Sequence, residues 1–306
     1  RSSDLAALQI PLTFVGRFIY STNVPVTTII PDRRLFAFDL ETGKRLWSHE
    51  PPPGWDGESG GFAQRMSVAG PPIVCGSRVL APFYRLQGRI DYHVGCFDLE
   101  TGALLWSTAL ISGQRELNMF GRAEHEFSAP PLVVSGDRVL ALTQLGAIAS
   151  LDLFTGELIW ETLYDQIPLP KNFMGVFRAP TRRGVWLNAP PVVSDGVVVA
   201  TPFDSSSLIG VDLANGGMLW TLNHQTIQEL SGGGAIDLLV GVRGSEVILS
   251  GNGVAALAAP RGLQRSAPDM PRWSFSDEEF QYPSPGRPVL AGHRIVLPLR
   301  DHRIEI

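Results

Sequence analysis

Residues that could carry acid–base or metal chemistry are scattered along this 306-residue chain. The densest group is Glu124-His125-Glu126, whose carboxylate and imidazole groups are possible metal ligands or proton carriers. Successive side chains on an extended segment point to opposite sides, so His125 is expected to face away from both glutamates. Because no second His or Cys stands close by in the sequence, a metal site is not predicted at this group.

No other set of residues forms a recognisable catalytic pattern. Asp56 and Glu58 could form a carboxylate pair, but the surrounding WDGESGG stretch is more typical of a turn. SGGGA at 231–235 precedes an expected strand rather than a helix, so it does not predict a phosphate site. Nucleophile-elbow, P-loop and EF-hand patterns are absent from the sequence. We therefore predict no catalytic, cofactor-binding or metal-binding residues and no bound cofactor, which favours a protein that is not an enzyme.

Charge and hydropathy argue against two classes of partner. The chain has a net charge of −5 and a pI near 5.7 without any basic run, so a nucleic-acid partner is not expected. No apolar stretch reaches the roughly 18 residues that a membrane-spanning helix needs. The 32 Gly and 24 Pro residues, with 18% charged residues, favour short strands and turns over long helices.

The strongest signal in the sequence is a decamer that recurs. It reads FDLETGKRLW at 38–47, FDLETGALLW at 97–106, LDLFTGELIW at 151–160 and VDLANGGMLW at 211–220. Its Asp recurs at intervals of 59, 54 and 60 residues, and the Trp recurs once more, 53 residues later, at Trp273. Asp and Thr side chains can bond nearby backbone N–H groups, and Gly can supply a positive φ. The decamer therefore predicts two short strands joined by a tight turn.

A second pair of short strands precedes each decamer. The clearest copies are PPIVCGSRVLAPF at 71–83, PPLVVSGDRVLAL at 130–142 and PPVVSDGVVVATPF at 190–203, each with a Gly-containing turn between two β-rich runs. Each period thus holds four strands, A to D, and such a repeat predicts the blades of an all-β β-propeller. We expect one propeller domain over 1–306 with five blades and a partial sixth. The blades are predicted at approximately 11–50, 70–109, 129–163, 189–223, 234–276 and 286–306.

The repeated Trp falls at a fixed position on the outermost strand, where it can pack against the neighbouring blade. Burying a Trp side chain removes about 150–250 Å² from water. We therefore interpret the motif as a structural contact between blades rather than as a catalytic group. The predicted blade-docking residues are Asp39, Gly43, Trp47, Asp98, Gly102, Trp106, Asp152, Gly156, Trp160, Asp212, Gly216, Trp220 and Trp273.

The two cysteines, Cys75 and Cys96, fall on strands A and C of one expected blade. One strand lies between them, which at ~4.8 Å per strand separates them by about 9–10 Å. This is too far for a disulfide bridge, so both are expected to be buried as small apolar side chains. They do not indicate a cellular compartment.

These repeats resemble those of the pyrroloquinoline quinone (PQQ)-like, or quinoprotein-type, propellers, whose pattern is an aliphatic residue, Asp, two variable residues, Thr-Gly, three variable residues and Trp. The first three decamers match this pattern fully and the fourth with one change. The resemblance implies a periplasmic or extracellular location, because most such proteins are exported. The family includes PQQ- and Ca²⁺-dependent dehydrogenases, whose quinone lies near an adjacent Cys-Cys pair, and non-enzymatic envelope scaffolds. Since this sequence has no Cys-Cys pair, no catalytic residue of those enzymes is carried over.

The sixth expected blade is incomplete. The sequence shows six A–B hairpins but only five outer-strand Trp residues, and it begins with neither an initiator Met nor a signal peptide. We therefore expect a fragment of a larger ring, of seven or eight blades, with a six-bladed ring as the alternative.

Long loops are expected to gather on one face of the propeller, opposite the tight A–B and C–D turns. They comprise the crossovers 51–69, 112–129 and 163–189 and an insertion at 22–32. Function concentrates on loops held by a rigid scaffold, and aromatic and Arg side chains anchor protein interfaces. The aromatics of these loops, which include Phe62 and Phe127, could instead plug the loops onto the blades. The candidate partner-binding residues are Trp55, Arg65, Phe120, Arg122, His125, Arg182, Arg183 and Trp186.

The preferred functional hypothesis is a non-catalytic scaffold of the bacterial cell envelope that binds protein, peptide or glycan on this long-loop face. One alternative is a PQQ- and Ca²⁺-dependent alcohol or sugar dehydrogenase whose site lies partly outside this chain. Another is a ligand-sensing domain of a larger membrane-anchored or kinase-linked protein. A Cys-Cys pair elsewhere in the full-length protein would favour the dehydrogenase, and an upstream kinase pattern or membrane span would favour the sensor.

Overall fold

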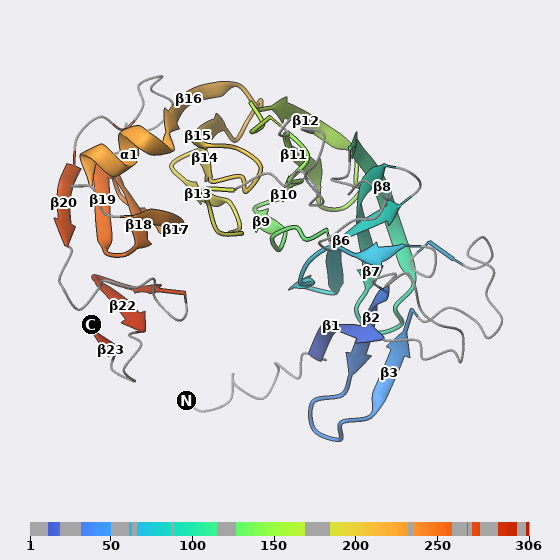
Figure 1. The fold of residues 1–306 in the computed structure, drawn as a ribbon. Coiled ribbons are helices and arrows are strands. Elements are labelled where there is room, and N and C mark those ends of the chain that lie inside the picture. Colours follow the sequence, from blue (N-terminus) through green and yellow to red (C-terminus); the bar gives the residue numbers. More distant parts are fainter. Residues whose placement is uncertain are drawn as a thin grey trace, which may run out of the picture. The chain divides into compact units, whose positions relative to one another are not determined.

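The computed structural model describes residues 12–18, 32–49, 61–62, 66–86, 89–114, 127–168, 184–231, 235–258, 268, 271–275, 287–298 and 304–305. Most of them lie in short antiparallel strands (Figure 1). The chain divides into two compact units. Unit 1 consists of Arg1–Leu145, Leu151–Leu158 and Leu169–Thr181, and unit 2 consists of Gly146–Ser150, Ile159–Pro168 and Arg182–Ile306.

The described strands form six sheets, each built from strands that are consecutive in the sequence. The first two sheets contain β1 (Leu12–Phe18), β2 (Asp32–Phe38) and β3 (Arg45–Ser48), and then β4 (Ser67–Val68), β5 (Ile73–Cys75), β6 (Arg78–Leu86), β7 (Ile90–Asp98) and β8 (Leu104–Gly113). The third and fourth contain β9 (Val133–Ser135), β10 (Arg138–Leu142), β11 (Ala147–Asp152) and β12 (Leu158–Leu163), and then β13 (Val192–Ser194), β14 (Val197–Ala200), β15 (Ser207–Asp212) and β16 (Met218–Asn223). The last two contain β17 (Ile236–Arg243), β18 (Glu246–Gly251), β19 (Val254–Ala258) and β20 (Pro271–Phe275), and then β21 (Val289–Ala291), β22 (Arg294–Pro298) and β23 (Ile304–Glu305).

The strand order confirms the predicted all-β fold of propeller blades. Three sheets have four strands in simple order, β12-β11-β10-β9, β13-β14-β15-β16 and β17-β18-β19-β20. The decamer supplies the last two strands of each of the first four sheets: in the fourth sheet, β15 and β16 pair antiparallel from Ser207↔Asn223 to Val211↔Met218. Adjacent consecutive strands joined by tight turns are the expected construction of a blade.

The A–B hairpins of the second to sixth sheets close through two-residue turns. The hairpin expected in the first sheet is not formed, because β1 is one continuous strand that pairs with β2. In the fourth sheet, Ser194 pairs with Val197 across Asp195 and Gly196, whose φ angles are 49° and 78°. Two successive positive φ angles give the turn that matches the twist of the flanking strands, and Asp-Gly is a favoured sequence for it. The local sequence therefore determines this turn.

Strand A of the second sheet is interrupted. Both β4 and β5 pair with β6, and Pro71 and Pro72 lie in the gap between them. Proline has no backbone N–H to donate to a ladder, so the strand breaks at this point. The PP dipeptide thus marks the start of the hairpin, as in β9 and β13, rather than part of a strand.

The helix α1 (His224–Leu230) was not expected from the sequence. Asn223 caps it, with its side-chain oxygen accepting a hydrogen bond from the Gln225 N–H at 2.9 Å. Ile227 is the helix's one described fully buried side chain. A seven-residue helix with a single buried position has too little apolar periodicity to be recognised in the sequence.

Apolar side chains of adjacent sheets fill the core of each unit. In unit 1, Leu80, Tyr92 and Cys96 pack in one cluster with Val139 and Leu151. In unit 2, a comparable cluster joins residues of β14, β15, β18 and β19. Cys96 is fully buried, Cys75 is partly buried against the same cluster, and both thiols are free. Burial raises the pKa of Cys96 to about 11, which keeps this thiol protonated and inert at neutral pH.

Candidate functional site: the decamer turns and the loop face

Each decamer turn is held by its Asp and Thr side chains. Asp98 Oδ1 accepts hydrogen bonds from the N–H of Thr101 at 2.9 Å and from its hydroxyl at 2.7 Å, and the Gly102 N–H donates to the Asp98 carbonyl at 2.9 Å. The turns at Asp39 and Asp152 repeat this arrangement. Donors to a carboxylate favour its charged form, so the Thr101 hydroxyl and N–H hold the pKa of Asp98 below its usual value. The turns are therefore preformed by local bonds.

The Trp of one decamer reaches the turn of the next. Its indole N–H donates to the backbone carbonyl of the residue that follows the Asp of the next decamer, so each bond joins two neighbouring sheets. The pairs are Trp47 to Leu99 at 2.9 Å, Trp106 to Leu153 at 3.2 Å and Trp160 to Leu213 at 2.9 Å. A buried indole keeps its hydrogen bond and its apolar contact at the same time.

The same indole rings lie against the glycines of these turns. A Cβ built on Gly102 would stand 2.6 Å from the Trp47 ring, and one on Gly156 would stand 2.4 Å from the Trp106 ring. Gly156 also has a φ of 74°, which other residues rarely adopt. From the sequence, Gly156 is expected only because the turn needs a positive φ. Its contact with the Trp106 ring is visible only in the structure.

A second hydrogen bond accompanies the indole bonds of Trp47, Trp106 and Trp160. Two positions after the Trp, the Thr108 hydroxyl donates to the Gly156 carbonyl at 2.6 Å, and the Thr162 hydroxyl donates to the Gly216 carbonyl. His49 occupies the corresponding position in the first sheet and bonds the backbone of Gly102. Burial lowers the pKa of His49, although this bond opposes the shift. Thr at this position is a recurring feature that the repeat pattern of Asp, Thr-Gly and Trp does not include.

Three of the predicted docking residues depart from this arrangement. Trp220 is buried but lies over Gly210 of its own sheet, where a Cβ would be 2.2 Å from its ring. The fifth repeat has no Thr-Gly turn to receive it. Trp273 is 40% exposed, and Gly43 has no heavy atom within 4 Å of where its Cβ would be. For Trp273 and Gly43, the described residues therefore supply no docking contact.

Two loop aromatics pack onto the second sheet. The Phe62 ring lies 5.4 Å from that of Phe83 and 5.9 Å from that of His93, both edge-on. The Phe127 ring lies 5.3 Å from that of Tyr84. These contacts agree with the alternative hypothesis, in which the loop aromatics pack against the blades instead of contacting a partner. They are directed inward and hold the neighbouring segments of 61–62 and 127–130 against the sheet.

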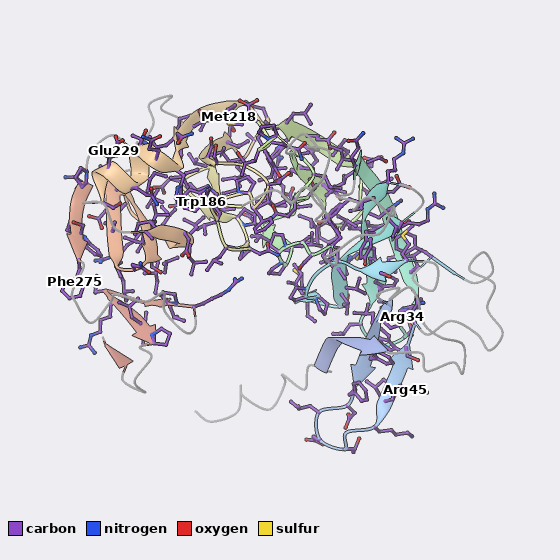
Figure 2. All side chains as sticks on the ribbon, in the orientation of Figure 1. Arg34, Arg45, Trp186, Met218, Glu229 and Phe275 are labelled. Atoms are coloured by element: carbon purple, nitrogen blue, oxygen red, sulfur yellow. The ribbon has the colours of Figure 1, made fainter. Side chains whose placement is uncertain are left out.

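Trp186 is the one candidate partner-binding residue that the structure describes. The side chain of Trp186, which is labelled in Figure 2, is 1% exposed. It packs edge-on against His224, with ring centroids 4.8 Å apart. The expectation that Trp186 presents its side chain to a partner is therefore corrected: it belongs to the core of unit 2. The other seven candidates, Trp55, Arg65, Phe120, Arg122, His125, Arg182 and Arg183, lie outside the described residues.

A buried carboxylate that the sequence did not single out lies between two loops of unit 2. Asp204, 3% exposed, accepts hydrogen bonds from the Tyr164 hydroxyl at 2.7 Å and from the Gln166 amide at 2.6 Å. Its carbonyl also accepts from the Ile167 N–H at 2.8 Å. With both carboxylate oxygens occupied by donors, Asp204 acts as a structural link between the segment after β12 and the B–C loop of the next sheet. Nothing in the sequence near Asp204 marks this role, because its partners lie about 40 residues away.

Most of the chain matches a known family. The family model described as outer membrane protein assembly factor BamB matches residues 8–168 and 91–297. The two matches overlap and together extend over most of the chain. The chain belongs to this BamB family of PQQ-like repeat propellers.

The solved structures to which the chain is similar include a BamB and a quinohemoprotein alcohol dehydrogenase. BamB from Moraxella catarrhalis is 15% identical, with 97% of this chain and 90% of that chain covered and a TM-score of 0.38. The quinohemoprotein alcohol dehydrogenase ADHIIG from Pseudomonas putida HK5 is 14% identical, with 89% of this chain and 54% of that chain covered and a TM-score of 0.45. No curated protein matches the chain in sequence.

The described part of this BamB-family chain has neither a cluster of metal ligands nor a membrane-spanning helix. There, no group of three or more His, Cys, Asp or Glu side chains is arranged to hold a metal ion. Asp56, Glu58 and the 124–126 group lie outside the described residues. Of the helical segments that the structure describes, none is long and apolar enough to cross a membrane.

Proposed function

We propose that this BamB-family propeller is a non-catalytic scaffold of the bacterial cell envelope, periplasmic or extracellular, that binds a protein partner on its long-loop face. The observation that carries the proposal is the family match over residues 8–168 and 91–297. The description of that family as an assembly factor favours a protein over a glycan as the partner.

The contacts between sheets support a scaffold role. Trp47, Trp106 and Trp160 each use the indole N–H, the ring and a residue two positions on to hold the next turn. We propose that these contacts dock neighbouring blades. Sheets that are docked to their neighbours provide a preorganised support for the loops between them, which favours binding.

The aromatic and arginine side chains of the long-loop face have different proposed roles. Phe62, Phe127 and Trp186 are used inward to hold loops to the sheets. The arginines of the same loops then become the stronger candidates for partner contact, because Arg is enriched at interface hot spots. Arg182 and Arg183 are adjacent in the sequence and form the densest charge of the 163–189 crossover.

Chemical cross-linking to outer-membrane assembly proteins in an envelope extract tests the proposal. We expect Arg182→Glu/Arg183→Glu to reduce the cross-linked partner at least about tenfold, because reversing a hot-spot charge costs more than ~1.4 kcal/mol. Arg294→Glu is the matched control, since Arg294 is exposed at the start of β22, next to an A–B hairpin turn, and should leave the yield unchanged. Equal yields for all three proteins would contradict the proposed surface.

Thermal shift with PQQ and Ca²⁺ tests the catalytic alternative on the same preparation. A ligand at about 100 times its dissociation constant adds ~2.7 kcal/mol of apparent stability. We expect no rise in Tm when both are added together. A rise that requires both would overturn the scaffold proposal in favour of a dehydrogenase.

A further inference from the structure

The sequence contains two Asn-Gly dipeptides, Asn215-Gly216 and Asn252-Gly253, and the structure describes both. Asparagine is a labile residue, because the backbone nitrogen of the next residue can attack its side-chain carbonyl carbon. Glycine favours this attack, since it has no Cβ to shield the nitrogen or to restrict the backbone. The two sites share this chemistry, so their surroundings decide whether either one reacts.

The turn at Asn215 engages every group that the reaction would use. The Asn215 amide donates to Asp212 Oδ2 at 3.0 Å, and its side-chain oxygen accepts from the Gly217 N–H at 2.7 Å. The Gly216 N–H, which carries the attacking nitrogen, donates to the Asp212 carbonyl at 2.9 Å. The Trp160 ring covers Gly216, so that a Cβ there would stand 2.7 Å from the ring. Attack at Asn215 therefore requires several hydrogen bonds to break first.

Asn252 lies in a different setting, the short connection between β18 and β19. The backbone of this connection is held at two points: the Gly251 N–H donates to the Gly253 carbonyl at 2.9 Å, and the Asn252 N–H donates to the Ala235 carbonyl at 2.7 Å. The Asn252 side chain is partly buried. Among the residues that the structure describes, nothing bonds its side-chain amide or accepts from the Gly253 N–H. Both reacting groups are therefore free to approach each other.

We propose that Asn252 is a site of spontaneous covalent modification, at which the side-chain amide is converted to aspartate and isoaspartate while Asn215 stays intact. The Gly253 nitrogen forms a bond to Asn252 Cγ and gives up its proton to solvent. The bond between Cγ and Nδ2 breaks, and the amide leaves as ammonia. One water molecule then opens the cyclic imide. Opening at Cγ gives aspartate, and opening at the main-chain carbonyl gives isoaspartate, in which the chain runs through the former side chain.

The modification changes this connection in two ways. It places a carboxylate, which is ionised at neutral pH, where a neutral amide stood. The isoaspartate form also adds a methylene to the main chain, within a connection of two residues that links the Ser250↔Val254 pair of the ladder. We expect this longer connection to weaken the hydrogen bond from Asn252 to Ala235.

Peptide mapping by mass spectrometry tests the proposal on the folded 306-residue protein, incubated in mildly alkaline buffer. We expect Asn252 to react at least about tenfold faster than Asn215, which corresponds to a difference of ~1.4 kcal/mol between the two barriers. The same incubation in urea, with the chain unfolded, is the control. There the two rates should become similar, because the hydrogen bonds that protect Asn215 are lost.

Asn252→Gln is the test variant and Asn215→Gln is its matched control. Glutamine keeps a neutral amide, but its additional methylene makes ring closure much slower. The acidic form that ion-exchange chromatography separates after incubation should be depleted in Asn252→Gln and unchanged in Asn215→Gln. If either variant does not fold, the peptide map of the wild type decides.

Three results would overturn the proposal. The first is an Asn252 that stays intact in the folded protein while the unfolded chain reacts, and the second is equal reaction of Asn215 and Asn252 in the folded protein. The third is a difference that persists in urea, which would assign it to the flanking sequence instead of the fold. The measurement needs no partner protein, so its outcome is independent of the proposed scaffold function.

Discussion

The glycine of the decamer turn serves two purposes. Gly156 closes a turn at a φ of 74° and also leaves room for the Trp106 ring, which a Cβ would meet at 2.4 Å. Gly136, in an A–B hairpin turn of the same unit, has a φ of 62° but no neighbouring atom within 4 Å. The two glycines therefore separate backbone strain from loss of the ring contact.

Replacing each glycine by Ala tests this distinction. Gly136→Ala should lower the free energy of unfolding by about 1–2 kcal/mol, the cost of a left-handed non-glycine residue. Gly156→Ala should lose a further ~1–3 kcal/mol, because the Trp106 ring must move. Urea denaturation at neutral pH measures both values, and equal losses would show that the ring contact adds nothing to stability.

The outer strands carry a second recurring contact, two positions after Trp47, Trp106 and Trp160. Thr108 and Thr162 fill this position with a hydroxyl, whereas β3 ends at Ser48 and the next residue is His49. The His49 ring is packed between Trp47 and Phe97, with centroids 5.4 and 4.9 Å away. A titratable group thus replaces a neutral one in the first sheet alone.

His49→Thr should reduce the acid sensitivity of the fold. Burial lowers the pKa of His49 below its usual 6.5, so below about pH 6.5 the unfolded chain takes up a proton that the folded chain does not, and stability falls. The His49→Thr variant removes this pH-dependent loss of stability. His93, whose pKa burial also lowers, keeps some of the slope.

The urea midpoint measured at pH 7.5 and pH 5.5 provides the readout. We expect the midpoint of His49→Thr to fall less between these two pH values than that of the wild type. An identical fall would mean that His49 is protonated as easily in the folded protein as in the unfolded chain.

At the scale of the molecule, stability is distributed over neighbouring sheets. Each described Trp bond joins only one sheet to the next, and each core cluster draws on a few adjacent strands. In repeat architectures, stability is close to a sum of the units and their nearest-neighbour contacts. A defect in one contact should therefore remain local.

Hydrogen exchange on Trp47→Ala tests this expectation. The substitution removes the bond to Leu99 and the cover over Gly102, so exchange should rise in β2, β3 and β7. Protection in β17, β18 and β19 of unit 2 should be unchanged. A uniform rise in exchange along the chain would instead indicate global cooperative unfolding.

The sequence by itself determined the four-stranded repeat and its turns. Asp98, Thr101 and Gly102 form hydrogen bonds with one another inside a five-residue segment. The decamer sequence therefore predicts this turn correctly. The hairpin at Asp195-Gly196 is equally local. Bonds between residues close in the chain depend little on the rest of the structure, so the strands and turns of a blade could be predicted. The seven-residue α1 has a single buried position and could not be predicted.

Only the tertiary structure decided which of the repeated residues find a partner. Trp47 and Trp273 look equivalent in the repeat, yet Trp47 bonds Leu99 and Trp273 is 40% exposed. Trp186 looked like a surface anchor and is buried instead. The acceptor of each Trp lies about 50 residues away, and burial depends on the packing of whole sheets, so neither property is contained in any short stretch of sequence.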